Sequence, residues 1–209
     1  MKGYHISIFR HGITDANENG IYIGKTDLPL SEAGREALMD KYEQLDYPKV
    51  QRVYSSPLER AVQTAEIIFP EREIVIVDDL REMDFGVFEG LPAEELVRLD
   101  SFKKWLKGGL DNPPPNGETL RSMMLRCYSA LNLMILDMMK EGFTHAGVVT
   151  HSGILMNMLS CFGLPKKKPM EFSCEPGEGY EILVTAMMWQ NSSAFEILGK
   201  VPYNDRDGD

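Results

Sequence analysis

The chain has 209 residues, 43% of them hydrophobic and 26% charged, which is the composition of an ordinary globular protein with one substantial core. It contains no apolar run of about eighteen residues or more, which excludes a typical membrane-spanning helix. The formal net charge of -10 argues against nucleic acid or an anionic membrane as a partner, so a site for an anion must gather its cations in one pocket.

In the first part of the chain, short apolar runs alternate with segments whose apolar residues recur at the spacing of a helix. Apolar runs predict strands at residues 4–9, 50–54 and 74–77, and helical spacing predicts helices at 31–45 and 58–68. Residues 15–30 are rich in Gly, Asn, Asp and Pro, which predicts a loop. Ser31 is the expected N-cap of the first helix, and Ser56 before Pro57 predicts the start of the second.

The second part begins with a segment of different composition. Residues 83–117 mix Gly, Pro and Trp with short helical pieces, and we predict that they form a cap inserted on one face of the sheet. A long helix is expected at 118–141, with a methionine-rich face that packs in the core. We further predict a strand at 146–150, a helix to about 162, and two late strands at 180–188 and 194–201 joined by a turn at 190–193.

This alternation predicts an α/β fold, a three-layer α/β/α sandwich with a mostly parallel central sheet. We expect one domain over residues 1–209, with the cap at about 83–117. Open α/β sheets bind their ligands at the carboxyl ends of strands, so residues that follow the strands should meet at one edge. These residues are Arg10, His11, Arg60, Glu82 and His151.

Two of the four histidines, His11 and His151, follow an apolar strand and lie near a glycine, whereas His5 and His145 are assigned no role. Phosphoryl transfer needs a nucleophile, donors for the phosphate oxygens and an acid for the leaving group. Histidine suits the first role because its ordinary pKa of about 6.5 leaves the imidazole mostly neutral at pH 7. We therefore predict that His11 is a nucleophile that accepts a phosphoryl group.

The predicted phosphate donors are Arg10 and Arg60, because the planar guanidinium matches phosphate oxygens and stays charged. Arg60 also lies near the start of a helix, where an anion is favoured. His151 adds a donor if it is protonated when substrate is bound.

Glu82 is the predicted acid for the leaving group. To give up a proton at neutral pH it needs a pKa above its usual value of about 4.3, and burial under Met83 and Phe85 would raise it. Glu89 and Glu94 are weaker candidates, which we expect to be solvated.

Six segments form a pattern when they are taken together. They are 10–17 (RHGITDAN), 24–34 (GKTDLPLSEAG), 55–65 (SSPLERAVQTA), 80–90 (LREMDFGVFEG), 116–119 (NGET) and 150–153 (THSG). This pattern resembles the histidine phosphatases, also called the phosphoglycerate mutase-like superfamily. Any one of the segments alone would be weak, but their combination is specific.

The resemblance implies a phosphohistidine on His11, a proton donor at Glu82, and neither a metal nor a cofactor. It also implies a set of residues around the phosphate and the substrate, namely Arg10, Asn17, Ile23, Gly24, Arg60, His151 and Ser152. Water would then release phosphate from His11, with Glu82 acting as the base. Ile13, where the pattern often has glutamate, and Lys25 depart from it on the substrate side.

The segment between Glu82 and Gly117 is short, which favours hydrolysis over transfer to a second hydroxyl. Residues 80–90 look most like phosphatases of the α-ribazole-phosphate type and their broad-specificity relatives. We therefore expect a small phosphorylated metabolite as substrate, with α-ribazole 5'-phosphate as the candidate, and a monomer or homodimer.

Three alternatives stay open at this stage. The first is a cofactor-dependent phosphoglycerate mutase, and the second is a non-catalytic module that binds a phosphorylated ligand or a protein. The third is a metal site built from His11 and His151, although no carboxylate or cysteine lies at a typical ligand spacing from either.

The expected location is cytoplasmic. The N-terminus lacks the basic and apolar regions of a secretory signal. Three cysteines without a CxxC pattern predict reduced, buried thiols.

Overall fold

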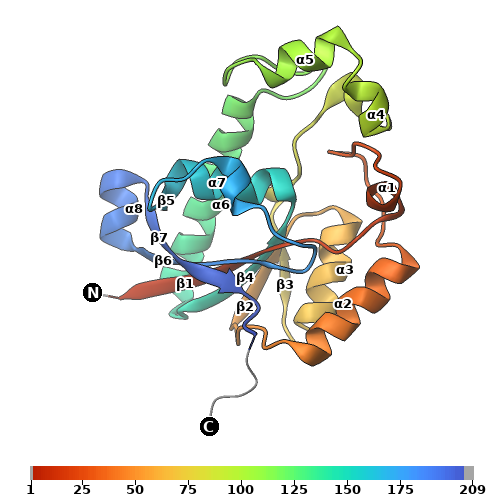
Figure 1. Ribbon diagram of the computed structural model, residues 1–209. Coiled ribbons are helices and arrows are strands. Elements are labelled where there is room, and N and C mark those ends of the chain that lie inside the picture. Colours follow the sequence, from red (N-terminus) through yellow and green to blue (C-terminus); the bar gives the residue numbers. More distant parts are fainter. Residues whose placement is uncertain (1, 205–209) are drawn as a thin grey trace.

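The computed structural model describes residues 2–204, which form a seven-stranded sheet covered by helices on both faces (Figure 1). The strands are β1 (Gly3–Arg10), β2 (Arg52–Ser55), β3 (Ile74–Ile76), β4 (His145–Thr150), β5 (Gly163–Leu164), β6 (Gly179–Thr185) and β7 (Phe195–Val201). The α-helices are α1 (Asp15–Glu18), α2 (Glu32–Gln44), α3 (Glu59–Ile68), α4 (Ala93–Leu96), α5 (Asp100–Leu106), α6 (Leu120–Glu141), α7 (Ser152–Phe162) and α8 (Ala186–Ser192). Short 3-10 helices are η1 (Asp78–Leu80), η2 (Gly86–Phe88) and η3 (Pro169–Phe172).

The strand order is β3-β2-β4-β1-β6-β7-β5, and β6 alone is antiparallel to its neighbours. Side chains of one strand are buried on both faces. Ile6 and Ile8 of β1 pack in a core with α6 and α7, whereas Phe9 packs in a second core with α2 and α3. Burial on both faces explains the continuous apolar runs from which the strands were predicted. The predicted fold class is confirmed.

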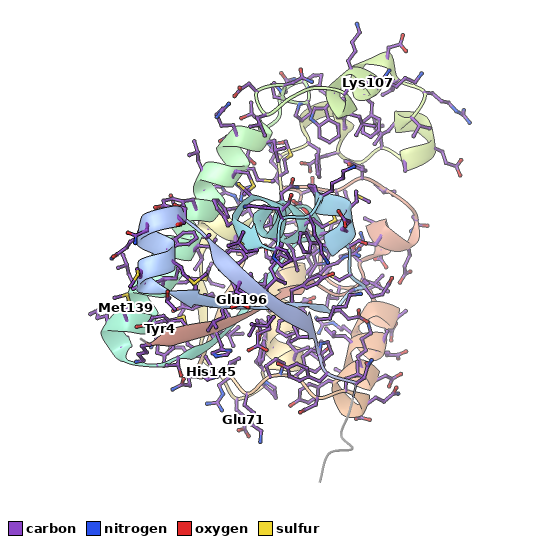
Figure 2. All side chains as sticks on the ribbon, turned by 60° about the vertical axis from the view of Figure 1, so that its left-hand side comes forward. Tyr4, Glu71, Lys107, Met139, His145 and Glu196 are labelled. Carbon is purple, nitrogen blue, oxygen red and sulfur yellow. The ribbon has the colours of Figure 1, made fainter. Side chains whose placement is uncertain are left out.

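The predicted cap segment, residues 83–117, contains η2, α4 and α5. In Figure 1, α4 and α5 stand beyond the helices that cover the sheet, and Figure 2 shows Lys107, just after α5, far from the strands. The segment has a small apolar cluster of its own, which also takes in Tyr22 from the loop after β1. Its members are Phe88, Leu96 and Phe102, with Tyr22, Phe85, Leu91 and Trp105 packed against them.

The predicted strand at 180–188 ends too late and the predicted turn at 190–193 is wrong, because β6 ends at Thr185 and α8 occupies the following residues. Its first turn is capped by the Thr185 hydroxyl, which accepts a hydrogen bond from the Met188 N–H. Trp189 is 3% exposed, and its ring stacks on that of Tyr128 with the centroids 5.1 Å apart. Burial of this large ring against α6 favours the helix over a hairpin turn.

Two smaller expectations also need correction. Residues 15–30 are not entirely loop, since Thr14 caps the single turn of α1. The cysteines are free, but Cys161 is exposed, whereas Cys127 and Cys174 are buried. Within residues 2–204, no helix has both the length and the apolar character needed to cross a membrane.

Candidate active site

The carboxyl ends of β1 and β4 bring the two predicted histidines together. The parallel register pairs Arg10 with Thr150, and His11 and His151 are the next residues. The His11 N–H donates to the Thr150 carbonyl (2.9 Å), and the two imidazole centroids lie 5.1 Å apart. The sheet therefore fixes both rings at one edge.

The other two histidines lie at the opposite end of the same strands. His5 and His145 are register partners, and their rings stack with centroids 4.7 Å apart. Figure 2 shows His145 at the edge of the sheet remote from the cap segment. These residues are thus separate from the candidate site.

His11 is held as a neutral imidazole with one free nitrogen. Its Nδ1 lies 2.6 Å from the Gly12 carbonyl oxygen, which can only accept, so Nδ1 carries the hydrogen and the Nε2 lone pair is free. Burial, followed by the charge of Arg60, lowers the pKa of His11 to about 3, against the opposing effect of the Gly12 hydrogen bond. At pH 7 the ring is therefore available as a nucleophile.

The lowered pKa of His11 predicts that acid weakens the fold. The unfolded chain takes up this proton near pH 6.5, whereas folded His11 stays neutral down to about pH 3. Between these values the unfolded state binds more protons, so the His11 contribution to the free energy of unfolding falls by about 1.4 kcal/mol per pH unit on acidification. We expect His11→Gln to remove this part of the slope in urea unfolding between pH 7 and 4. Equal slopes in the two proteins would contradict the buried neutral state.

His151 is fully buried and contacts a serine that sequence reasoning missed. Its Nε2 lies 2.8 Å from Ser56 Oγ, which also accepts from the Leu58 N–H. A Ser56 hydroxyl that donates to Nε2 leaves the imidazole hydrogen on Nδ1. Burial, and then the charges of His11 and Arg60, lower the pKa of His151, so this ring is neutral without a bound anion. Its protonation with substrate bound stays a prediction.

Two buried side-chain nitrogens lack a hydrogen-bond partner among the described residues, Arg10 Nε and His151 Nδ1. The Arg10 guanidinium is held through a different nitrogen, because its Nη1 donates to the Cys174 carbonyl (2.8 Å). Both nitrogens belong to residues that we predicted as phosphate ligands. A ligand with acceptor oxygens would give both nitrogens a partner.

Arg60 is the second residue of α3 and is 2% exposed. Its Nη1 and Nη2 donate to the carbonyls of Thr26 (2.8 Å) and Gly24 (2.7 Å), so the guanidinium fixes the loop after β1. Its charge also acts on His11, as the lowered pKa of that ring shows. Gly24 must be glycine, because a Cβ there would lie 2.0 Å from the Met83 carbonyl oxygen.

Glu82 is buried and its carboxylate is held by two backbone N–H groups. Met83 donates to Oε1 (2.8 Å) and Gly153 donates to Oε2 (2.9 Å). A Cβ on Gly153 would lie 2.6 Å from Oε1, so glycine permits this close approach. Burial raises the pKa of Glu82, although these two hydrogen bonds and then Arg60 oppose the shift. The direction is the one that a proton donor needs.

Glu89, which we expected to be solvated, contacts the loop that contains Lys25 and Thr26. Glu89 is half-buried, and its carboxylate accepts hydrogen bonds from the backbone N–H groups of Lys25, Thr26 and Phe85. The Lys25 ammonium forms an ion pair with Asp84 (2.8 Å). Glu89 thus holds the loop that Arg60 fixes from the other side.

The other three predicted substrate contacts, Asn17, Ile23 and Ser152, differ in how far they are buried. Asn17 is exposed, and its Oδ1 accepts from the N–H of Thr14 (3.1 Å) and from the Thr14 hydroxyl. Ile23 is half-buried in the loop before Gly24, and Ser152 is the half-buried first residue of α7. Their contacts with substrate stay predictions.

Comparison with known proteins identifies the family of this chain. The sequence pattern of the histidine phosphatase superfamily (branch 1) matches residues 6–194. The chain belongs to the histidine phosphatase superfamily. The resemblance seen in the sequence is confirmed.

Proteins with different named activities are similar to the chain. Phosphoglycerate mutase-like protein 4 of Arabidopsis thaliana is 33% identical over 164 residues, which cover 73% of this chain and 68% of that protein. The adenosylcobalamin/alpha-ribazole phosphatase of Escherichia coli is 27% identical over 175 residues, or 81% of this chain and 85% of that one. The crystal structure of the alpha-ribazole phosphatase from Shigella flexneri shares the fold, with a TM-score of 0.74, 23% identity and coverage of 97% and 96%.

Proposed function

We propose that this protein is a phosphatase that hydrolyses small-molecule phosphate monoesters through a phosphohistidine on His11. The observation that carries the proposal is the pair of buried donors without partners, Arg10 Nε and His151 Nδ1. A phosphoryl oxygen would accept a hydrogen bond from each of them. A neutral nucleophile at the sheet edge and a buried carboxyl group whose pKa is raised by burial supply the other two groups that the reaction needs.

The reaction has two steps. The lone pair of His11 Nε2 attacks phosphorus, the bond from phosphorus to the ester oxygen breaks, and that oxygen takes the proton of Glu82. The Glu82 carboxylate then removes a proton from a water molecule, whose oxygen attacks phosphorus and breaks the bond to Nε2. Phosphate leaves, and Glu82 is again protonated. Arg10, Arg60 and His151 stabilise the charge on the phosphoryl oxygens in both steps.

For the leaving group we propose an aromatic nucleoside-like alcohol, with α-ribazole 5'-phosphate as the substrate. The rings of Tyr22 and Phe85 lie 4.7 Å apart, and Phe85 packs against Gly24. Burial raises the pKa of Tyr22, and the Glu82 carboxyl raises it further. The name of the Escherichia coli relative supports the same substrate.

A panel of monoesters tests the proposal. It contains α-ribazole 5'-phosphate, adenosine 5'-phosphate, p-nitrophenyl phosphate, and 3-phosphoglycerate with and without 2,3-bisphosphoglycerate, all assayed in EDTA. We expect phosphate release without a metal ion and the highest kcat/KM for α-ribazole 5'-phosphate. Formation of 2-phosphoglycerate that requires the bisphosphate would show a mutase instead. Phosphate binding without any turnover would favour a binding module, and recovery only on addition of metal would contradict the metal-free mechanism.

A further inference from the structure

Arg126 of α6 lies behind the candidate acid and contacts the backbone that carries it. Its Nη1 lies 2.8 Å from the Asp79 carbonyl oxygen and 2.5 Å from that of Arg81, and its Nη2 lies 3.2 Å from the Glu82 carbonyl oxygen. The guanidinium donates in addition to the Glu118 carboxylate, through Nε and Nη2 at 2.9 Å each. One side chain therefore holds three carbonyls around Glu82.

The remaining carbonyl of residues 79–82 is also held by a side chain, since Leu80 accepts from the Thr150 hydroxyl (2.8 Å). This part of the chain follows β3 without pairing as a strand, so side chains supply the hydrogen bonds that a sheet would otherwise provide. The Arg126 and Glu118 side chains are only 11% and 16% exposed, so water screens their interaction weakly.

We propose that Arg126, oriented by Glu118, is a positioning residue. It holds the backbone of residues 79–82 so that the Glu82 carboxyl can reach the ester oxygen of the substrate. The inference rests on the proposed function, in which Glu82 protonates the leaving group. The planar fork is essential, because lysine can supply the charge but cannot bind three carbonyls and a carboxylate at once. A displacement of about 1 Å at a reacting group can lower a rate on the order of 10²-fold.

Arg126→Lys is the direct test, and the chain offers a matched control. Arg121 lies on the same helix and makes the same fork with Asp111 (2.6 and 2.9 Å), but its side chain is 55% exposed and contacts no part of the site. We would measure the first phosphoryl transfer under single-turnover conditions with an alkyl phosphate and with p-nitrophenyl phosphate. The nitrophenolate leaves without a proton, so its transfer does not depend on the acid.

For Arg126→Lys we expect a loss on the order of 10²-fold in the alkyl phosphate rate, with substrate affinity retained and less than about threefold change with p-nitrophenyl phosphate. Arg121→Lys should leave both rates unchanged. Glu118→Gln retains the shape of the carboxylate but not its charge, and it should show the same selective loss in a smaller amount. If thermal unfolding shows that Arg126→Lys does not fold, Glu118→Gln tests the proposal in its place.

Equal losses with both esters, or no loss with either, would overturn the positioning role of Arg126. Absence of ester hydrolysis in the unsubstituted protein would overturn the proposed function and this inference with it. The two failures are therefore distinguishable.

Discussion

His11→Ala should abolish hydrolysis of phosphate monoesters. The substitution removes the only attacking atom of the proposed mechanism, so we expect kcat to fall by at least about 10³-fold. The variant should also lose a phosphoenzyme intermediate that the unsubstituted protein forms with labelled substrate. Acid quench breaks a phosphorus–nitrogen bond, so this intermediate is to be trapped in alkali.

The matched control for this experiment is His145→Ala. That histidine is on the strand paired with β1, is exposed, and lies at the opposite end of the sheet. The His145→Ala variant should retain activity and should still form the alkali-stable phosphoenzyme. A folded His11→Ala protein with near-normal turnover would remove His11 from the role of nucleophile.

Glu82→Gln should separate substrates by their leaving groups. The amide cannot supply the proton that an alkoxide needs, so the first phosphoryl transfer from an alkyl phosphate should slow by about 10²–10⁴-fold. Transfer from p-nitrophenyl phosphate should change by a few-fold only, because nitrophenolate needs no proton. Single-turnover measurements are required, since loss of the Glu82 base would also slow the later attack of water.

Glu94→Gln provides the comparison for Glu82→Gln, because Glu94 is an exposed carboxylate of α4 that makes no contact with the site. We expect normal rates with both esters. If Glu82→Gln lost the same factor with alkyl and nitrophenyl esters, the carboxyl would not be the acid of the first step.

The sequence was sufficient to predict which residues meet at the sheet edge. Apolar runs identify β1 and β4, and parallel strands end at the same side, so His11 and His151 were expected at one edge of the sheet. That β1 and β4 are adjacent strands is shown by the structure. Ser31 was also predictable as an N-cap, since a cap acts over a few residues. The start predicted at Ser56 and Pro57 was wrong, because Leu58 is the N-cap of α3 and Pro57 precedes the first turn. These signals are local or depend only on strand direction.

What the sequence could not predict depends on contacts between distant segments. In the sequence, Arg126 is one of several charged residues on a long helix. Its proposed role follows only from its contact with the Glu82 carbonyl, 44 positions away in the chain. The same holds for Glu89 and the backbone of Thr26, and for Ser56 and His151, which lie 63 and 95 positions apart. In α8, burial of Trp189 outweighed the local preference of a polar segment for a turn.

In the proposed mechanism, Arg10 Nε and His151 Nδ1, which have no hydrogen-bond partner within residues 2–204, also affect release of the product. Orthophosphate carries the same oxygens as the ester it comes from, so these donors will retain the product as well as the substrate. The protein should therefore be inhibited by its own product, with a rate of turnover that follows the phosphate concentration around it. Under the proposed mechanism, the residues that bind the ester therefore also set the phosphate concentration at which turnover slows.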